Sequence, residues 1–146
     1  MVWQVEGRAT GHVLDRDLRL LIDKANPVCF DVGANEGQTI QLLQRCYARP
    51  VIHSFEPSSA TCQSLTKQSF GDQVQVHQLA LGEHTGAAVF RNYKHSELSS
   101  FLAMHPDKAE NIFADEEMVS VESVQVETLD NFWQRTFMDY RPVRTS

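Results

Sequence analysis

The sequence predicts an α/β fold in which helices cover both faces of a parallel β-sheet. Short apolar runs recur at 28–32, 51–55 and 74–79. The stretches between these runs carry apolar residues at helical spacing. Strands and helices that alternate in units of about 30 residues imply right-handed crossovers and a parallel sheet.

The first predicted element is a helix over 14–25. Its apolar residues recur at spacings of three and four: Leu14, Leu18, Leu21 and Ile22. This spacing predicts one buried face. Asn26-Pro27 ends the helix, because proline disfavours helical backbone at the preceding residue. The run 28–32 then predicts a buried strand.

A glycine turn at 33–37 follows this strand and opens a second predicted helix. The apolar positions of that helix are Ile40, Leu42, Leu43, Cys46 and Tyr47. The run 51–55 predicts the next strand, and a third helix starts at 57–59. After Gly71-Asp72, the run 74–79 predicts a third parallel strand.

The pattern changes after Gly82. Residues 87–91 and 119–126 alternate imperfectly between apolar and polar, which predicts an antiparallel pair of strands. The polar stretch 92–118 between them predicts a long loop, and such loops are functional or mobile. A single domain over 1–146 is therefore expected to contain a helical lead-in at 1–26, a βαβαβ core at 27–82 and an antiparallel extension with its loop at 83–135.

Bulk properties exclude several classes of function. The 146 residues are 42% hydrophobic, which suits one compact domain. The net charge of -6, with dispersed Lys and Arg, argues against nucleic acid and anionic membrane surfaces as partners. No apolar run approaches the roughly 20 residues of a membrane span, and no signal peptide is recognisable, so a cytoplasmic protein is expected. The cysteines and histidines lack metal-site spacing, and we expect no metal.

The strongest candidate site is the turn that follows the first parallel strand. It begins with Asp31 and continues through Gly33, Ala34, Asn35 and Gly37. The two glycines would let the backbone come close to a ligand. The start of the following helix offers backbone amides to a carboxylate or phosphate, and Asp31 can balance a cationic group.

A second signal lies after the next strand, where Glu56 and Pro57 follow the apolar run 51–55. An acid at this place can accept both hydroxyl protons of a ribose. Together the two signals point to a ligand that contains a nucleoside.

The glycine spacing separates the candidate ligands. A dinucleotide site would read GxGxxG and a P-loop GxxxxGK[ST], whereas this turn reads Gly-Ala-Asn-Glu-Gly. S-adenosylmethionine fits better, because it carries an ammonium for Asp31 and a carboxylate for the turn amides. A nicotinamide-dependent oxidoreductase stays as an alternative, although it leaves the glycine pattern unexplained.

The chain resembles the FkbM family of methyltransferases. Four motifs in the family's order carry the resemblance: residues 30–37, Phe55-Glu56-Pro57, Ala80-Leu81-Gly82 and Thr128-Leu129-Asp130. The resemblance implies a Rossmann-like class I methyltransferase sheet, S-adenosyl-L-methionine as cofactor, and transfer to oxygen of a sugar or another small-molecule acceptor. It also places Gln78 and Ala80 near the adenine.

One departure from the family pattern concerns the segment after Thr128-Leu129-Asp130. The family continues with a strand like Leu-Lys-Ile-Asp-x-Glu-Gly, and the tail from Phe132 shows none. The resemblance therefore implies a sheet that is incomplete on its C-terminal side, with no catalytic residue assigned and little activity of this chain alone. A further alternative is a non-catalytic fragment that binds the cofactor or forms a homo-oligomer through the unfinished sheet edge.

Overall fold

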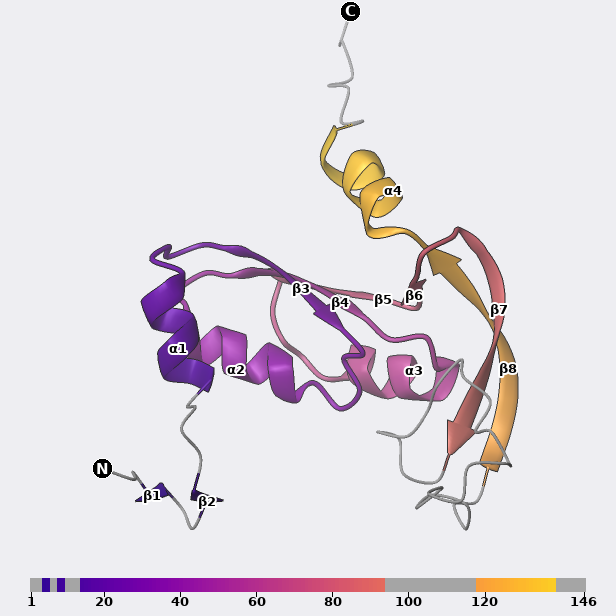
Figure 1. Cartoon of the computed structure of the whole chain (residues 1–146), viewed down its shortest axis with the longest axis horizontal. Helices are drawn as coiled ribbons and strands as arrows, with labels where there is room; N and C mark the ends of the chain where they lie inside the picture. The colour runs from indigo at the N-terminus through magenta and orange to yellow at the C-terminus, as the bar shows by residue number, and fades with distance from the viewer. Residues whose placement is uncertain (1–3, 6–7, 10–13, 94–117, 139–146) are drawn as a thin grey trace, which may run out of the picture.

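The computed structural model describes residues 4–5, 8–9, 14–93 and 118–138 (Figure 1). Over these residues the protein is a mixed α/β structure with a parallel sheet of three strands and four α-helices. Near the N-terminus, β1 (Gln4–Val5) and β2 (Arg8–Ala9) form a short antiparallel pair. The sequence had not predicted this pair.

The parallel sheet has the order β3-β4-β5. Its strands are β3 (Val28–Val32), β4 (Val51–Phe55) and β5 (Val74–His77). The helices α2 (Gln38–Cys46) and α3 (Ser59–Lys67) connect them. In the register, Phe30 pairs with His53 and Phe55 pairs with His77. The predicted alternation of strands and helices is confirmed, although β5 ends two residues before the predicted limit at 79.

One face of the parallel sheet packs against helices and forms the main hydrophobic core. Helices α1 (Leu14–Leu21), α2 and α3 all lie on this side of the sheet (Figure 1). The buried members of the core are Ala34, Ile40, Leu43, Cys46, Tyr47, Ile52 and Leu65. The core thus fixes the helix starts that follow β3 and β4.

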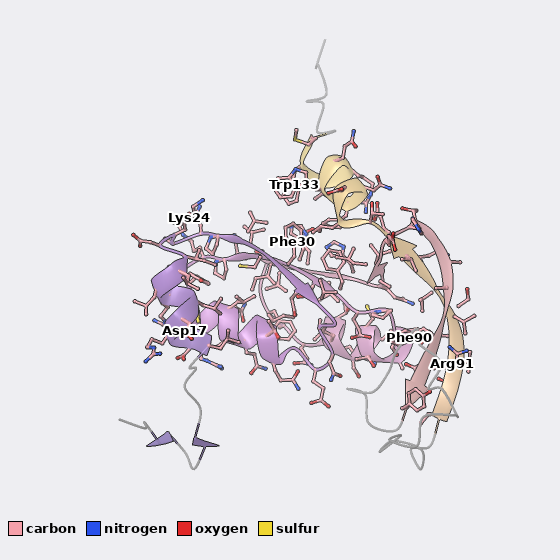
Figure 2. All side chains as sticks on the ribbon, viewed as in Figure 1. Asp17, Lys24, Phe30, Phe90, Arg91 and Trp133 are labelled. Atoms are coloured by element: carbon pink, nitrogen blue, oxygen red, sulfur yellow. The ribbon has the colours of Figure 1, made fainter. Side chains whose placement is uncertain are left out.

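The opposite face is aromatic and is covered by the C-terminal helices α4 (Leu129–Trp133) and η2, a π-helix over Gln134–Met138. The fully buried Phe132 ring lies edge-on to Phe55 and His77, with ring centroids 4.8 and 5.0 Å apart. Trp133 contacts Phe30 at 6.1 Å (Figure 2). Helices therefore lie on both faces, although no helix had been predicted here.

A second sheet has the order β6-β8-β7. The predicted antiparallel pair is confirmed as β7 (Gly86–Tyr93) with β8 (Met118–Glu127). Strand β6 (Ala80–Leu81) pairs with β8 in parallel. Strand β6 therefore belongs to this second sheet rather than to the parallel sheet, and the predicted boundary of the core at residue 82 stays a prediction. Only two residues, 78 and 79, separate β5 from β6.

The predicted buried face of the first helix is mostly wrong. Helix α1 ends at Leu21 rather than at 25, and Leu14 and Leu21 are 61% and 83% exposed. Only Leu18 packs against the main core, and its carbonyl oxygen accepts the Tyr47 hydroxyl. The contacts of α1 with the end of α2 run through the Asp15 and Leu18 carbonyl oxygens and the Arg19 side chain, and they leave the Leu14 and Leu21 side chains in solvent.

Most of the predicted loop over 92–118 lies outside the described residues, which resume at Met118. Asn92 and Tyr93 belong to β7. Within the part of the chain that the structure describes, no helix is long and apolar enough to cross a membrane.

Candidate functional site

The candidate site lies where β3 and β4 end, at the same edge of the parallel sheet. The backbone amides of Gly33 and Ala34 both donate to the Phe55 carbonyl oxygen, at 2.9 and 3.0 Å. Parallel strands bring their carboxyl ends to one edge, which is where open α/β sheets bind ligands. The glycine turn is thereby held against the end of β4.

The turn uses backbone conformations that favour glycine. Gly33 has φ 81°, Asn35 has φ 45° and Gly37 has φ 89°. Asparagine is one of the few side chains that tolerate the left-handed region. The three residues direct the chain from β3 into α2 within a few positions.

The two glycines face different surroundings. A Cβ atom added at Gly33 would meet nothing within 4 Å, whereas one added at Gly37 would lie 2.7 Å from Cζ of Phe70. The absence of a side chain at Gly37 therefore lets the Phe70 ring pack against the backbone of the turn. The prediction that both glycines let the backbone approach a ligand stays a prediction, and at Gly37 the place of a Cβ atom is taken by the Phe70 ring.

Unmet hydrogen-bonding capacity gathers at the start of α2. Gly37 occupies the N-cap position, and no side chain caps the first turn of this helix. The Oδ1 atom of Asn35 is buried and has no hydrogen-bond partner among the described residues. Free amides and the positive end of the helix dipole suit an anionic group, and a buried amide oxygen calls for a donor.

Glu56 is buried rather than exposed at the strand end. Glu56 is only 6% exposed. Its Oε2 atom accepts the Asn35 amide at 2.9 Å, and its Oε1 atom accepts the Ser58 amide at 3.0 Å. Burial raises the pKa of the Glu56 carboxyl, and the two amides lower it in part. The carboxylate therefore joins the glycine turn to the start of α3.

Asp31 is 5% exposed and lies on the face of the sheet that packs against α2 and α3. Its Oδ2 accepts the Ser54 hydroxyl at 3.3 Å, and Thr39 supplies a second side-chain hydrogen bond. Burial raises the pKa of Asp31 despite these bonds. Ser54 could have been found from sequence, because the alternation of β4 puts it beside Asp31.

The other three residues predicted for the site, Pro57, Gln78 and Ala80, have different surroundings. Pro57 connects Glu56 to Ser58 and is partly buried. Gln78 is exposed and follows His77, whose carbonyl oxygen accepts the Glu56 amide at 3.0 Å. Ala80, by contrast, packs in the small core of the second sheet with Phe90 and Val124. The structure thus brings Gln78 near Glu56, and it gives the Ala80 side chain a packing role.

Sequence reasoning missed Glu122, which links the second sheet to this edge. Its carboxylate oxygens accept the Ser59 amide at 3.3 and 3.2 Å, and Oε1 accepts Asn92 Nδ2 at 2.8 Å. Burial pushes the pKa of Glu122 upward, but these hydrogen bonds outweigh it and hold the pKa below its usual value. The contact spans 63 residues of sequence, and no local pattern signals it.

Comparisons with known proteins leave the family open. No protein-family model, curated protein sequence or solved structure matches the chain. Among the described residues, no group of three or more His, Cys, Asp or Glu side chains is arranged to hold a metal ion. The function must therefore be argued from the geometry of the site.

Proposed function

We propose that the chain binds S-adenosylmethionine at the ends of β3 and β4, in the cofactor site of a Rossmann-like methyltransferase that acts on oxygen of a small-molecule acceptor. One observation carries the proposal. A glycine turn that leads into an uncapped helix start is joined to an acid at the end of the neighbouring parallel strand, through the Asn35 amide and Glu56 Oε2. Nucleosides bind at this place in open α/β sheets.

The residues present suit the separate parts of this cofactor. The start of α2 has no side-chain cap and can receive a carboxylate. Each carboxylate oxygen of Glu56 accepts one backbone amide, and because a carboxylate has about four acceptor positions it can still accept ribose hydroxyls. The open side of Gly33 leaves room beside the backbone. Asn35 Oδ1 offers a further acceptor.

The choice against a nicotinamide dinucleotide rests on the turn. A dinucleotide turn needs a second glycine that lets the backbone approach the pyrophosphate. Here Asn35 stands two residues after Gly33, at the place of that second glycine, and the Cβ position of Gly37 is filled by Phe70. One open glycine suits the carboxylate of an amino-acid group better than a diphosphate bridge.

The bound cofactor would supply an electrophilic methyl group on a sulfonium. The residues of this chain would bind and orient it: the α2 amides hold the carboxylate, Asp31 balances positive charge, and Glu56 fixes the ribose. Positioning and exclusion of water supply most of the rate in such a displacement. No residue is assigned as a base, and the acceptor is specified only as a small-molecule hydroxyl.

A pair of glycine variants tests the proposed site. Gly33 and Gly71 have nearly equal φ values, 81° and 86°, and both face open space. Gly71 lies before β5, at the end of the sheet where the parallel strands begin, whereas the candidate site lies where they end. Gly33→Val should weaken S-adenosylmethionine binding by at least about tenfold, because the valine side chain enters the proposed site. Gly71→Val should leave binding unchanged, and it is a matched control because both variants carry a similar backbone strain.

The readout is intrinsic tryptophan fluorescence during titration with S-adenosylmethionine, on variants whose circular dichroism matches the parent. Equal affinities for the two variants would remove the glycine turn from the site. Saturation by NAD⁺ but not by S-adenosylmethionine would favour the oxidoreductase alternative.

A further inference from the structure

The start of α3 is held by two carboxylates that come from different sheets. Glu56, at the end of β4, accepts the Ser58 amide through Oε1 at 3.0 Å. Glu122 lies on β8, which passes the start of α3 (Figure 1), and its two carboxylate oxygens accept the Ser59 amide at 3.3 and 3.2 Å. Free amides and the positive end of the helix dipole favour acids at this place. Two neighbouring amides of the backbone thus bind one acid from each sheet.

The second sheet itself determines where the Glu122 side chain points. Residues two positions apart in a strand lie on the same face. Glu122 therefore shares a face with Val124, which is buried in the core of the second sheet, while Val121 and Ser123 are exposed on the other face. On β7, Asn92 donates its Nδ2 group to Glu122 Oε1 at 2.8 Å. The carboxylate is thus directed toward α3 and held there from its own sheet.

We propose that Glu122 is a positioning residue of the candidate site, which holds Glu56 in place through Ser58 and Ser59. Ser58 is only 4% exposed, and its hydroxyl oxygen caps α3 by accepting the Thr61 amide at 3.5 Å. A displacement of the backbone at 58–59 would strain the hydrogen bonds to both carboxylates at once. The second sheet thereby fixes Glu56 relative to the glycine turn. The role in ligand binding rests on the proposed function, in which Glu56 binds the ribose hydroxyls.

The same contact makes the second sheet part of the electrostatics of the site. Burial raises the pKa of Glu56, and the negative charges of Glu122 on β8 and Asp31 on β3 raise it further. On α3, burial and, to a smaller extent, the charge of Glu56 raise the pKa of the Cys62 thiol. Hydrogen bonds hold the pKa of Glu122 below its usual value, so this residue keeps its charge. Removal of that charge should therefore alter the titration of Glu56.

Two substitutions separate the charge of Glu122 from its hydrogen bonds. Glu122→Gln removes the charge and keeps an acceptor oxygen for the Ser59 amide, so it should lower the pKa of Glu56. Glu122→Ala also removes the acceptor, so the Ser58 and Ser59 amides should exchange with solvent faster, by at least about tenfold. Glu83→Gln and Glu83→Ala are the matched controls, because Glu83 is largely exposed and lies in the loop after β6.

Both quantities can be measured without a ligand. Carboxyl-carbon NMR gives the pKa of Glu56, whose signal is identified by its loss in Glu56→Gln, and hydrogen exchange reports on the amides. Each variant must keep the parental circular dichroism, and should Glu122→Ala fail to fold, the Glu56 pKa in Glu122→Gln decides. An unchanged Glu56 pKa in Glu122→Gln, or an unchanged exchange rate of the Ser58 amide in a folded Glu122→Ala, would overturn the proposal.

Titration with S-adenosylmethionine and S-adenosylhomocysteine then connects Glu122 to binding. Glu122→Ala should weaken both ligands by a similar factor, about fivefold or more, because both carry the ribose that Glu56 would bind. A much larger loss for the cationic S-adenosylmethionine would show that Glu122 contacts the sulfonium directly and would overturn the positioning role. If the parent binds neither ligand while Glu56 and Ser58 respond as expected, the proposed function fails and the positioning of Glu56 stands. Binding by the parent with no response of Glu56 or Ser58 overturns this inference and leaves the proposed function intact.

Discussion

The Glu56 carboxylate accepts the backbone amide of Asn35 at 2.9 Å, and this bond ties the turn after β3 to the end of β4. Asn35 holds a left-handed conformation with φ 45°. The second oxygen of Glu56 accepts the Ser58 amide. One buried carboxylate thus fixes the relative position of the starts of α2 and α3, whatever ligand binds there.

We predict that Glu56→Ala lowers the free energy of unfolding by about 1 to 3 kcal/mol, because two buried amides lose their acceptor. Glu56→Gln keeps one acceptor oxygen and should cost less. Urea denaturation measures both. Glu83→Ala is the control, since Glu83 is largely exposed and lies in the next loop. If Glu56→Ala is as stable as the control, the carboxylate does not hold the turn.

Gly37→Ala should destabilise the fold more than Gly33→Ala. Both substitutions force a side chain into the left-handed region, at about 1 to 2 kcal/mol. Only the new methyl group at Gly37 also meets Phe70, at 2.7 Å. Thermal unfolding compares the two variants.

Phe70→Leu should relieve part of the additional cost of Gly37→Ala, and a double-mutant cycle isolates that coupling. Additive effects of the two substitutions would show that the Phe70 ring does not limit the space at Gly37.

Asp31→Asn should stabilise the free protein at neutral pH and weaken the binding of a cationic ligand. Burial raises the pKa of Asp31 in the folded state. The folded state therefore holds more protons between the unfolded and folded pKa values, and stability falls as pH rises through that window. Asparagine removes this cost and still bonds to the Ser54 hydroxyl.

The stabilising effect of Asp31→Asn should be present at pH 7 and should vanish at a pH below the unfolded pKa of the carboxyl. Thermal melts at several pH values give the comparison, with Asp72→Asn as the exposed control. A variant less stable than the parent at pH 7 would contradict the proposed cost of the buried charge.

The stacked histidine pair predicts a loss of stability in acid. His53 Nδ1 lies 3.1 Å from His77 Nε2, beneath Phe132. Burial, the neighbouring His53 and Arg135 lower the pKa of His77 from 6.5 to about 4. Between those values the unfolded state binds more protons, so stability is full above pH 6.5 and declines as pH falls toward 4.

The expected loss is at most about 3 kcal/mol, and less because the His77 ring is partly exposed. His77→Gln should flatten the decline of unfolding free energy between pH 7 and 4, whereas His84→Gln, on an exposed side chain, should leave the slope unchanged. Equal slopes in the two variants would show that His77 does not titrate in this window.

Short, mostly apolar runs in the sequence were enough to predict the parallel strands β3 and β4. Strands β3 and β4 have the predicted bounds, because each is a short, mostly apolar run between turn residues. The prediction that β3 is buried is wrong at its two ends, where Val28 and Val32 are exposed. The glycine turn was also predictable, since two glycines directly after an apolar run indicate a tight turn. Both glycines have the positive φ values that such a turn favours. Which of the two glycines faces open space was not predictable, because Phe70 reaches Gly37 from the far end of α3.

Elements defined by long-range contacts were missed. Helices α4 and η2 form on the aromatic face built from Phe30, His53 and His77, and the residues 128–138 alone show no clear helical period. The two residues of β6 form a strand only because β8 lies beside them. Tertiary pairing outweighs local propensity in such short segments.

Calorimetric titration of the folded chain tests the central claim most directly, with S-adenosylmethionine, S-adenosylhomocysteine and NAD⁺ as separate ligands. We expect saturable heats of binding for the first two, no heat for NAD⁺, and an affinity for S-adenosylmethionine that Asp31→Asn lowers by about tenfold. A chain with the expected circular dichroism that binds neither sulfur ligand, or that binds NAD⁺ instead, would contradict the proposal.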